Sequence, residues 1–252
     1  FDEPAVSTLL QEVPVSLDKH KEDDYIDFYY ERNLPEQLSK EGPKIAAGDI
    51  NGDGLDDIYI GGAKDQSGQL YVQKADGGFT KANASFFEKY KDLEDAAVLF
   101  FDADKDGDLD LYIGAGGNNA EPNQRATQHR LFKNDGKGNF TFDALAFSRN
   151  NMNIAVAVNY DYDGDGDEDL FVGGRSVPFN YGAAPQSYLF RNDGKGHFLD
   201  VTAELSTLIK YIGMVTGAVW ADINGDADKE LIITGQCMAT RIFSYNKTYN
   251  KF

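Results

Sequence analysis

The chain has 252 residues, of which 41% are hydrophobic, so it can bury a sizeable core in one large domain or two small ones. Its formal net charge of −18 argues against nucleic acid as a partner, because phosphate binding requires a basic surface. No run of about 18 apolar residues occurs, so the sequence predicts no membrane span. The 14 Tyr, 17 Phe and 26 Gly residues favour an all-β chain with short strands.

The first 40 residues differ from the rest of the chain because they contain no acidic repeat. The aromatic stretch 25–30 is typical of a strand, and Asn33-Leu-Pro35 is typical of a turn. We therefore expect residues 1–40 to form an N-terminal segment that is either an edge strand or an incomplete repeat.

From about residue 41, a nine-residue acidic pattern occurs four times, in loops 49–57, 102–110, 161–169 and 222–230. The starting positions are separated by 53, 59 and 61 residues. A nearly constant period of this length is the signature of a repeat architecture. Nearly half of the 42 acidic residues lie in these loops, which indicates that most of the excess negative charge belongs to them.

The third loop, Asp161-Tyr-Asp-Gly-Asp-Gly-Asp-Glu-Asp169, has an aspartate at every second position. Crowding this much negative charge is unfavourable unless a cation offsets it. Calcium takes six to eight oxygen ligands at about 2.3–2.6 Å. Side chains at positions 1, 3 and 5, the carbonyl at position 7 and a carboxylate at position 9 can supply them. Gly166 at position 6 permits the sharp turn that directs position 7 inward.

Short apolar segments bounded by Gly flank each loop, and their length and composition predict strands. A hairpin signal follows in each unit, as in the nearly identical stretches 131–140 and 189–198. Four strands in a unit of about 60 residues are typical of a propeller blade. We therefore predict an all-β fold, a β-propeller of four-stranded blades, with repeats at about 41–97, 98–153, 154–216 and 217–252.

The motif Asp-x-[Asp/Asn]-x-Asp-Gly-x-x-Asp, followed by an apolar strand ending in Gly-Gly, resembles the FG-GAP/VCBS repeat family, known from the integrin α-subunit propeller. The Asn-Asp-Gly-x-Gly-x-Phe hairpins are similar to the bacterial surface-protein branch, which often accompanies ASPIC/UnbV-type domains. The resemblance covers about 41–252 and implies calcium between the first two strands of each blade. Family propellers usually have seven blades, whereas four repeats are clear here. Either residues 1–40 and degenerate strands contribute further blades, or the chain is part of a longer ring with further propeller or ASPIC/UnbV-type segments.

The resemblance also implies a ligand set for each loop. The side-chain ligands are Asp49, Asn51, Asp53 and Asp57; Asp102, Asp104, Asp106 and Asp110; Asp161, Asp163, Asp165 and Asp169; and Asp222, Asn224, Asp226 and Glu230. The carbonyl ligands are those of Leu55, Asp108, Asp167 and Asp228. Three to four Ca²⁺ ions are expected. The fourth site should be the weakest, because Ala227 replaces glycine at position 6 and Glu230 is one methylene longer than Asp.

The function expected from these features is a calcium-binding, non-enzymatic interaction module. Calcium would have a structural role, and weak sites remain filled only where calcium is abundant, which predicts an extracellular, cell-surface or periplasmic location. Two long connections, 116–130 and 175–187, lie on the side away from the calcium loops and are candidates for binding a protein or glycan. A purely architectural domain that spaces its neighbours is a further interpretation.

The alternative is a hydrolase or lyase built on a propeller, with catalytic acids on the face opposite the calcium loops. The sequence contains no Gly-x-Ser-x-Gly or His-Glu-x-x-His motif, although paired carboxylates for glycoside chemistry stay open. We expect His129 and His197 to lie on the surface because they occur beside or within hairpins. Cys237 is the one cysteine, and its apolar surroundings predict a buried side chain.

Overall fold

The computed structural model describes residues 13–118 and 128–252, which contain fifteen β-strands in four antiparallel sheets. The first sheet contains β1 (Ile45–Gly48), β2 (Asp57–Ile60), β3 (Gln69–Gln73) and β4 (Phe79–Ala82). The second contains β5 (Asp95–Phe101), β6 (Asp110–Ala115), β7 (Arg130–Asn134) and β8 (Phe140–Asp143). The third contains β9 (Asn153–Tyr160), β10 (Asp169–Ser176), β11 (Tyr188–Asn192) and β12 (Phe198–Asp200). The fourth contains β13 (Met214–Ala221), β14 (Glu230–Gln236) and β15 (Arg241–Phe243).

Helices are few and short. They are α1 (Ala84–Phe87), α2 (Thr202–Leu205), α3 (Thr207–Lys210) and the 3-10 helices Asp27–Tyr29, Leu38–Lys40 and Glu88–Tyr90. None of the helices in the described part of the chain has the length and hydropathy needed to cross a bilayer. The fold is therefore all-β, as predicted.

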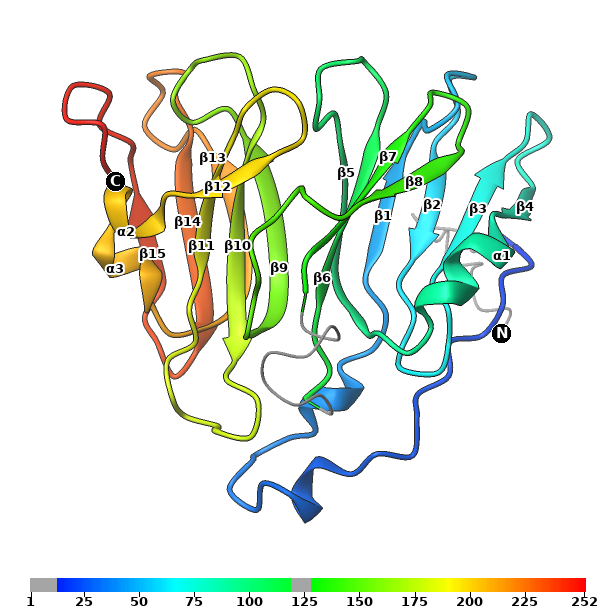
Figure 1. The fold of residues 1–252 in the computed structure, drawn as a ribbon, viewed down its shortest axis with the longest axis horizontal. Helices are drawn as coiled ribbons and strands as arrows, with labels where there is room; N and C mark the ends of the chain where they lie inside the picture. Colours follow the sequence, from blue (N-terminus) through cyan, green and yellow to red (C-terminus); the bar gives the residue numbers. More distant parts are fainter. Residues whose placement is uncertain (1–12, 119–127) are drawn as a thin grey trace, which may run out of the picture.

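The four sheets stand side by side in chain order, from the first sheet (blue and cyan) to the fourth (orange and red) in Figure 1. The first strand of each sheet packs against the first strand of the next, so β1 contacts β5, β5 contacts β9, and β9 contacts β13. Within each sheet the strands follow one another in sequence order. This arrangement places equivalent loops of all four repeats at the same end of the molecule (Figure 1).

Three hydrophobic clusters fill the spaces between neighbouring sheets. In strand β6, side chains that alternate between the two faces of the sheet belong to two different clusters. Leu111 and Ile113 are buried against the first sheet, whereas Tyr112 between them is buried against the third. Strand β10 repeats this pattern, because Leu170 faces the second sheet and Phe171 faces the fourth. The two inner sheets are thus buried on both faces, which explains their nearly continuous apolar sequences.

In its described part, the N-terminal segment does not contain the edge strand that was one of our two expectations for residues 1–40. Residues 13–44 contain no strand in the structure, and the aromatic stretch forms the 3-10 helix Asp27–Tyr29. This segment crosses the end of the sheets opposite the acidic loops (Figure 1). It is held there by hydrogen bonds from Asn118 Nδ2 to Asp27 (3.0 Å) and Glu31 (2.7 Å).

The four sheets begin at Ile45, Asp95, Asn153 and Met214. The last repeat differs from the others, because its third strand is followed only by an isolated bridge between Asn246 and Lys251. Its sequence lacks the Asp-Gly turn that forms the hairpins of the second and third repeats.

Candidate metal centres

Each acidic loop connects the first two strands of its sheet, so the predicted strand–loop–strand setting is present in all four repeats. We number the loop positions 1 to 9 from the first aspartate. Position 9 is the first residue of the second strand in every repeat: Asp57, Asp110, Asp169 and Glu230.

The carboxylate at position 1 organises the backbone of the loop. Its Oδ2 accepts a hydrogen bond from the N–H of position 6 in every repeat, at 2.7 Å for Gly54, 3.1 Å for Gly107, 2.9 Å for Gly166 and 3.0 Å for Ala227. In the first loop these hydrogen bonds, foremost that from Gly54, lower the pKa of Asp49. The loop backbone is therefore wrapped around an ionised carboxylate.

Position 6 has a left-handed backbone in all four loops. The φ angles are +82° at Gly54, +91° at Gly107, +88° at Gly166 and +76° at Ala227. Glycine adopts this conformation at little cost, whereas an alanine is strained there. Ala227 thus keeps the loop geometry at an energetic cost, as expected from the sequence.

The carboxylate at position 9 is buried in each repeat and anchors the third strand of the sheet. Asp57 accepts a hydrogen bond from Gln73 N at 2.8 Å, Asp110 from Asn134 N at 2.8 Å, and Asp169 from Asn192 N at 2.9 Å. In the fourth repeat the Ser244 hydroxyl donates to Glu230 at 3.2 Å instead. From the sequence we predicted position 9 only as a metal ligand. Its role as an anchor for the third strand becomes visible only once the strand register is known.

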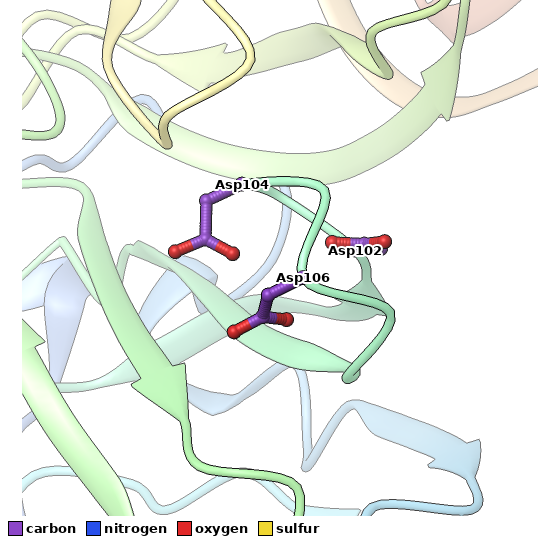
Figure 2. Close-up of side chains that lie close together, drawn as sticks. All are labelled: Asp102, Asp104 and Asp106. Atoms are coloured by element: carbon purple, nitrogen blue, oxygen red, sulfur yellow. The ribbon is translucent and has the colours of Figure 1, made fainter.

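In the second and third loops, carboxylates converge. Oxygens of Asp102, Asp104 and Asp106 lie within 4.8 Å of one another, and Figure 2 shows these three side chains extending from one turn of the loop. The corresponding group in the third loop consists of Asp161, Asp163 and Asp169. Both groups can hold a metal ion.

Several oxygens of these two groups are buried and have no hydrogen-bond partner among the described residues: Asp102 Oδ1, Asp104 Oδ1 and Asp169 Oδ2. Asp169 is only 1% exposed, so its unpartnered oxygen is an unfavourable arrangement for the protein alone. A hard cation would satisfy such atoms, because calcium prefers carboxylate oxygens. The donor set therefore fits the ion that the acidic pattern predicts.

The pKa shifts of the carboxyl groups at position 9 also favour a bound cation. Desolvation, followed by repulsion from neighbouring aspartates, raises the pKa of Asp169 to about 8. Desolvation also raises the pKa of Asp110 to about 7. A nearby divalent charge would offset these effects and favour the ionised carboxylates.

The first and fourth loops carry asparagine at position 3, so they bring fewer carboxylates together. Asn51 Nδ2 lies 3.4 Å from Asp57 Oδ2, and Asn224 Nδ2 donates to Glu230 Oε1 at 2.9 Å. Glu230 Oε2 also accepts from Ile223 N at 3.1 Å, so both of its oxygens are engaged within the chain.

Basic side chains contact the acidic loops, a feature that the sequence analysis missed. Lys133 Nζ lies 3.1 Å from Asp104 Oδ2, and Arg191 Nε lies 3.5 Å from Asp163 Oδ2. At position 7, Asp167 pairs with Lys105 of the preceding loop, and Asp228 pairs with Lys247 at 2.7 Å. These pairs join strands or loops far apart in sequence, so only the strand register reveals them.

Neighbouring repeats are connected at position 2 of the loops. Asn134 Nδ2 donates to the carbonyl oxygen of Ile50 at 2.7 Å, and Asn192 Nδ2 donates to that of Ala103 at 2.8 Å. In the third loop the ring of Tyr162 packs against Tyr245, with centroids 5.0 Å apart. Each of the first three loops is thus covered by residues at the end of the third strand of the following repeat or just after it. The position-2 residues have exposures of 1% (Ile50), 0% (Ala103), 2% (Tyr162) and, in the last repeat, 53% (Ile223).

Three residues outside the loops have environments that differ from or refine our expectations. His129 is buried rather than on the surface, with Nδ1 at 2.7 Å from the hydroxyl of Tyr112. Cys237 is exposed rather than buried, whereas the ring of His197 is on the surface as expected.

The long connections were expected to contact a partner, and part of 116–130, residues 119–127, lies outside the described residues. In the connection 175–187, Arg175 is buried and pairs with Glu36 at 2.8 Å and Glu41 at 2.7 Å. Arg175 therefore holds the N-terminal segment and is not a free surface group.

A family model described as FG-GAP-like repeat matches residues 49–113 and 161–233, which is more than half of the chain. The chain belongs to the FG-GAP-like repeat family. The first matched segment spans the first two acidic loops, and the second spans the third and fourth. All four acidic loops therefore lie within the matched segments.

No curated protein matches this FG-GAP-like repeat chain. Among solved structures, the V. cholerae biofilm matrix protein Bap1 is similar, with 16% identity and a TM-score of 0.35. The match covers 83% of this chain and 31% of the Bap1 chain, so this chain spans less than one third of that protein's length. At this TM-score the similarity carries no argument about function.

Proposed function

We propose that this chain is a calcium-binding, non-enzymatic interaction module that works outside the cytoplasm or on a cell surface, with calcium in a structural role. The proposal rests on Asp169, which is 1% exposed, has an unpartnered Oδ2, and lies beside Asp161 and Asp163. An ion at this position would satisfy that oxygen and neutralise carboxylates that repel one another.

Calcium bound there would stabilise the contact between repeats as well as the loop itself. Asp169 also accepts the N–H of Asn192, whose side chain binds the preceding loop at Ala103. A ligand that binds only the folded state stabilises it by about 2.7 kcal/mol when its concentration is a hundred times Kd. Three or four such sites would supply much of the stability of a domain.

The enzymatic alternative receives no support from Asp27 and Glu31. Asp27 and Glu31, two acids at the end opposite the loops, are buried and engaged with Asn118. A pair of carboxylates that catalyses glycoside hydrolysis must contact its substrate. We propose that this end contacts a protein or a glycan through the connections 116–130 and 175–187, because long connections on a rigid scaffold commonly carry binding residues.

Thermal unfolding with and without a chelator, together with a metal count per chain, tests the calcium proposal. We expect three to four Ca²⁺ ions per chain and a fall in Tm of about ten degrees or more when they are removed. Magnesium at the same ionic strength should not restore the Tm, because it requires a smaller octahedral shell. A fall of about one or two degrees on chelation would contradict a structural role for calcium.

A further inference from the structure

The basic residues that contact position 3 occupy equivalent places in two of the repeats. The register pairs Phe132 with Leu111 and Phe190 with Leu170, and Lys133 and Arg191 are the residues that follow. Both basic side chains contact the aspartate at position 3 of their own loop, Asp104 or Asp163.

The same register identifies the equivalent residues in the other two repeats. Tyr71 pairs with Ile58 in the first sheet and Phe243 pairs with Leu231 in the fourth, so the equivalent positions are Val72 and Ser244. Both are neutral, and both belong to the repeats in which position 3 is asparagine. Within this one chain, a basic residue accompanies aspartate and a neutral residue accompanies asparagine.

This pairing equalises the formal charge of the four predicted side-chain ligand sets. The predicted side-chain ligands at positions 1, 3, 5 and 9 carry a formal charge of −3 in the first and fourth loops and −4 in the second and third. Adding Lys133 or Arg191 returns the second and third loops to −3. The acids at position 7 do not enter this balance, because they were assigned as carbonyl ligands, and Asp167 and Asp228 pair with other lysines.

The geometry of Lys133 is suited to positioning Asp104. Its ammonium group also donates to the carbonyl oxygen of Lys195 at 2.6 Å and lies 3.6 Å from Asp143. The ammonium group is thus fixed by three groups and contacts only one oxygen of Asp104, while Oδ1 of that residue has no partner. In the third repeat Arg191 is likewise placed between Asp163 and Glu204, the latter at 3.8 Å.

We infer that Lys133 and Arg191 are positioning residues of the metal sites: each holds one oxygen of the position-3 aspartate and keeps the site at −3, which favours a divalent over a trivalent cation. The inference rests on the proposed function, because it requires the loops to bind cations. The electrostatic attraction of an ion grows with its charge, so an uncompensated −4 site gains more for a trivalent ion than for a divalent one.

The test compares Lys133→Val, Asp104→Asn and the double variant, which reproduces the Asn51 and Val72 combination of the first repeat. Lys81→Val is the matched control, because Lys81 is also a strand lysine but pairs with Asp18 at 2.6 Å. Calorimetric titration with Ca²⁺ and with Tb³⁺ gives the affinities. A chain with Asp102→Ser and Asp106→Ser supplies the reference that isolates the second loop. Circular dichroism verifies that each variant is folded.

We expect Lys133→Val to raise the Ca²⁺ affinity of the second loop about fivefold and its Tb³⁺ affinity about tenfold. Asp104→Asn should lower both affinities, and the double variant should return to within about threefold of the wild type. Lys81→Val should leave both unchanged. Equal affinities in Lys133→Val and the wild type, a loss of affinity for either ion, or an equal gain for both ions would overturn the inference.

The third loop provides an independent test, because Asp163→Asn with Arg191→Ser reproduces the fourth repeat. The single and double variants of the third loop should show the same order of cation affinities as those of the second loop. They carry the test if Lys133→Val proves to be unfolded. The absence of that order would overturn the inference. Failure of the proposed function is distinguishable, because the wild type itself would then bind no Ca²⁺ at millimolar concentration. Calcium binding that is insensitive to Lys133 and Arg191 would reject only this inference.

Discussion

Asn134 Nδ2 lies 2.7 Å from the carbonyl oxygen of Ile50, so a side chain of the second repeat completes the acidic loop of the first. The Oδ1 of the same residue accepts the N–H of Asp135 at 2.9 Å and that of Gly138 at 3.0 Å. Asn134 therefore fixes its own hairpin and the neighbouring loop at once. Asn192 repeats this arrangement between the third repeat and the second loop.

Replacing Asn134 by Ala should lower the free energy of unfolding by about 1–3 kcal/mol, because the buried carbonyl of Ile50 loses its donor. Urea unfolding monitored by circular dichroism measures this change. Asn139→Ala is the control. Asn139 is exposed at the hairpin tip, and its side chain donates to Asp135 of the same repeat. Equal effects of the two substitutions would show that the contact between repeats is not stabilising.

The third and fourth loops should differ in their response to the loss of a ligand at the same position. Asp165→Ala should lower the Tm in calcium more than Asp226→Ala, because both oxygens of Glu230 in the fourth loop are already engaged within the chain. The expected loss at the third site is about 2–3 kcal/mol at saturating calcium. Melts in a chelator should remove the difference. Equal losses in calcium would contradict the ranking of the sites.

Position 6 offers a reciprocal pair of substitutions. Gly166→Ala should destabilise the protein by about 1 kcal/mol, and Ala227→Gly should stabilise it by a similar amount, because both residues have φ near +80°. Space does not limit the first change, since a Cβ at Gly166 would lie 3.5 Å from its nearest neighbour, Lys105 Nζ. Denaturant midpoints measured in a chelator separate this backbone effect from metal affinity. A stabilising Gly166→Ala would refute the assignment of strain.

The buried imidazole of His129 predicts a pH effect. Burial, followed by the charge of Arg130, lowers the pKa of His129 to about 3, against an ordinary value near 6.5. The unfolded chain therefore binds a proton between these values that the folded chain does not. The stability that His129 preserves at neutral pH is lost as the pH falls below about 6.5.

Unfolding in urea at pH 7 and pH 5 checks this prediction with His129→Phe, which keeps an aromatic ring among Phe147, Tyr188 and Phe190. The wild type should lose about 1–2 kcal/mol more than the variant over this interval. His197→Phe is the control for replacing an imidazole by a phenyl ring, because the His197 ring is exposed. Identical slopes for the wild type and His129→Phe would exclude a contribution from His129.

The repeat spacing was sufficient to predict four acidic loops between the first two strands of each sheet, because charge and glycine placement are local properties of the sequence. The Asp-Gly hairpins of the second and third repeats followed in the same way. The ends of the array could not be predicted. Residues 13–44 follow the surface of the repeats through contacts such as Arg175 with Glu36, which have no local pattern.

At the candidate sites, the sequence identified the carboxylates but not their surroundings. The contact of Lys133 with Asp104 depends on strand register, and hairpins alone do not fix which side chains meet across a sheet. Likewise, His129 occurs beside a polar connection, yet the start of β7 places it between two sheets. Burial of this kind is a property of packing between repeats, which no single repeat contains.

The covering of each loop by its successor gives the array a direction. Ile50, Ala103 and Tyr162 are enclosed by residues that come later in the chain, whereas Ile223 is 53% exposed. Val219 and Ile242 of the same repeat are also exposed. Position 2 of the loop is therefore buried in the first three repeats and open to solvent in the fourth.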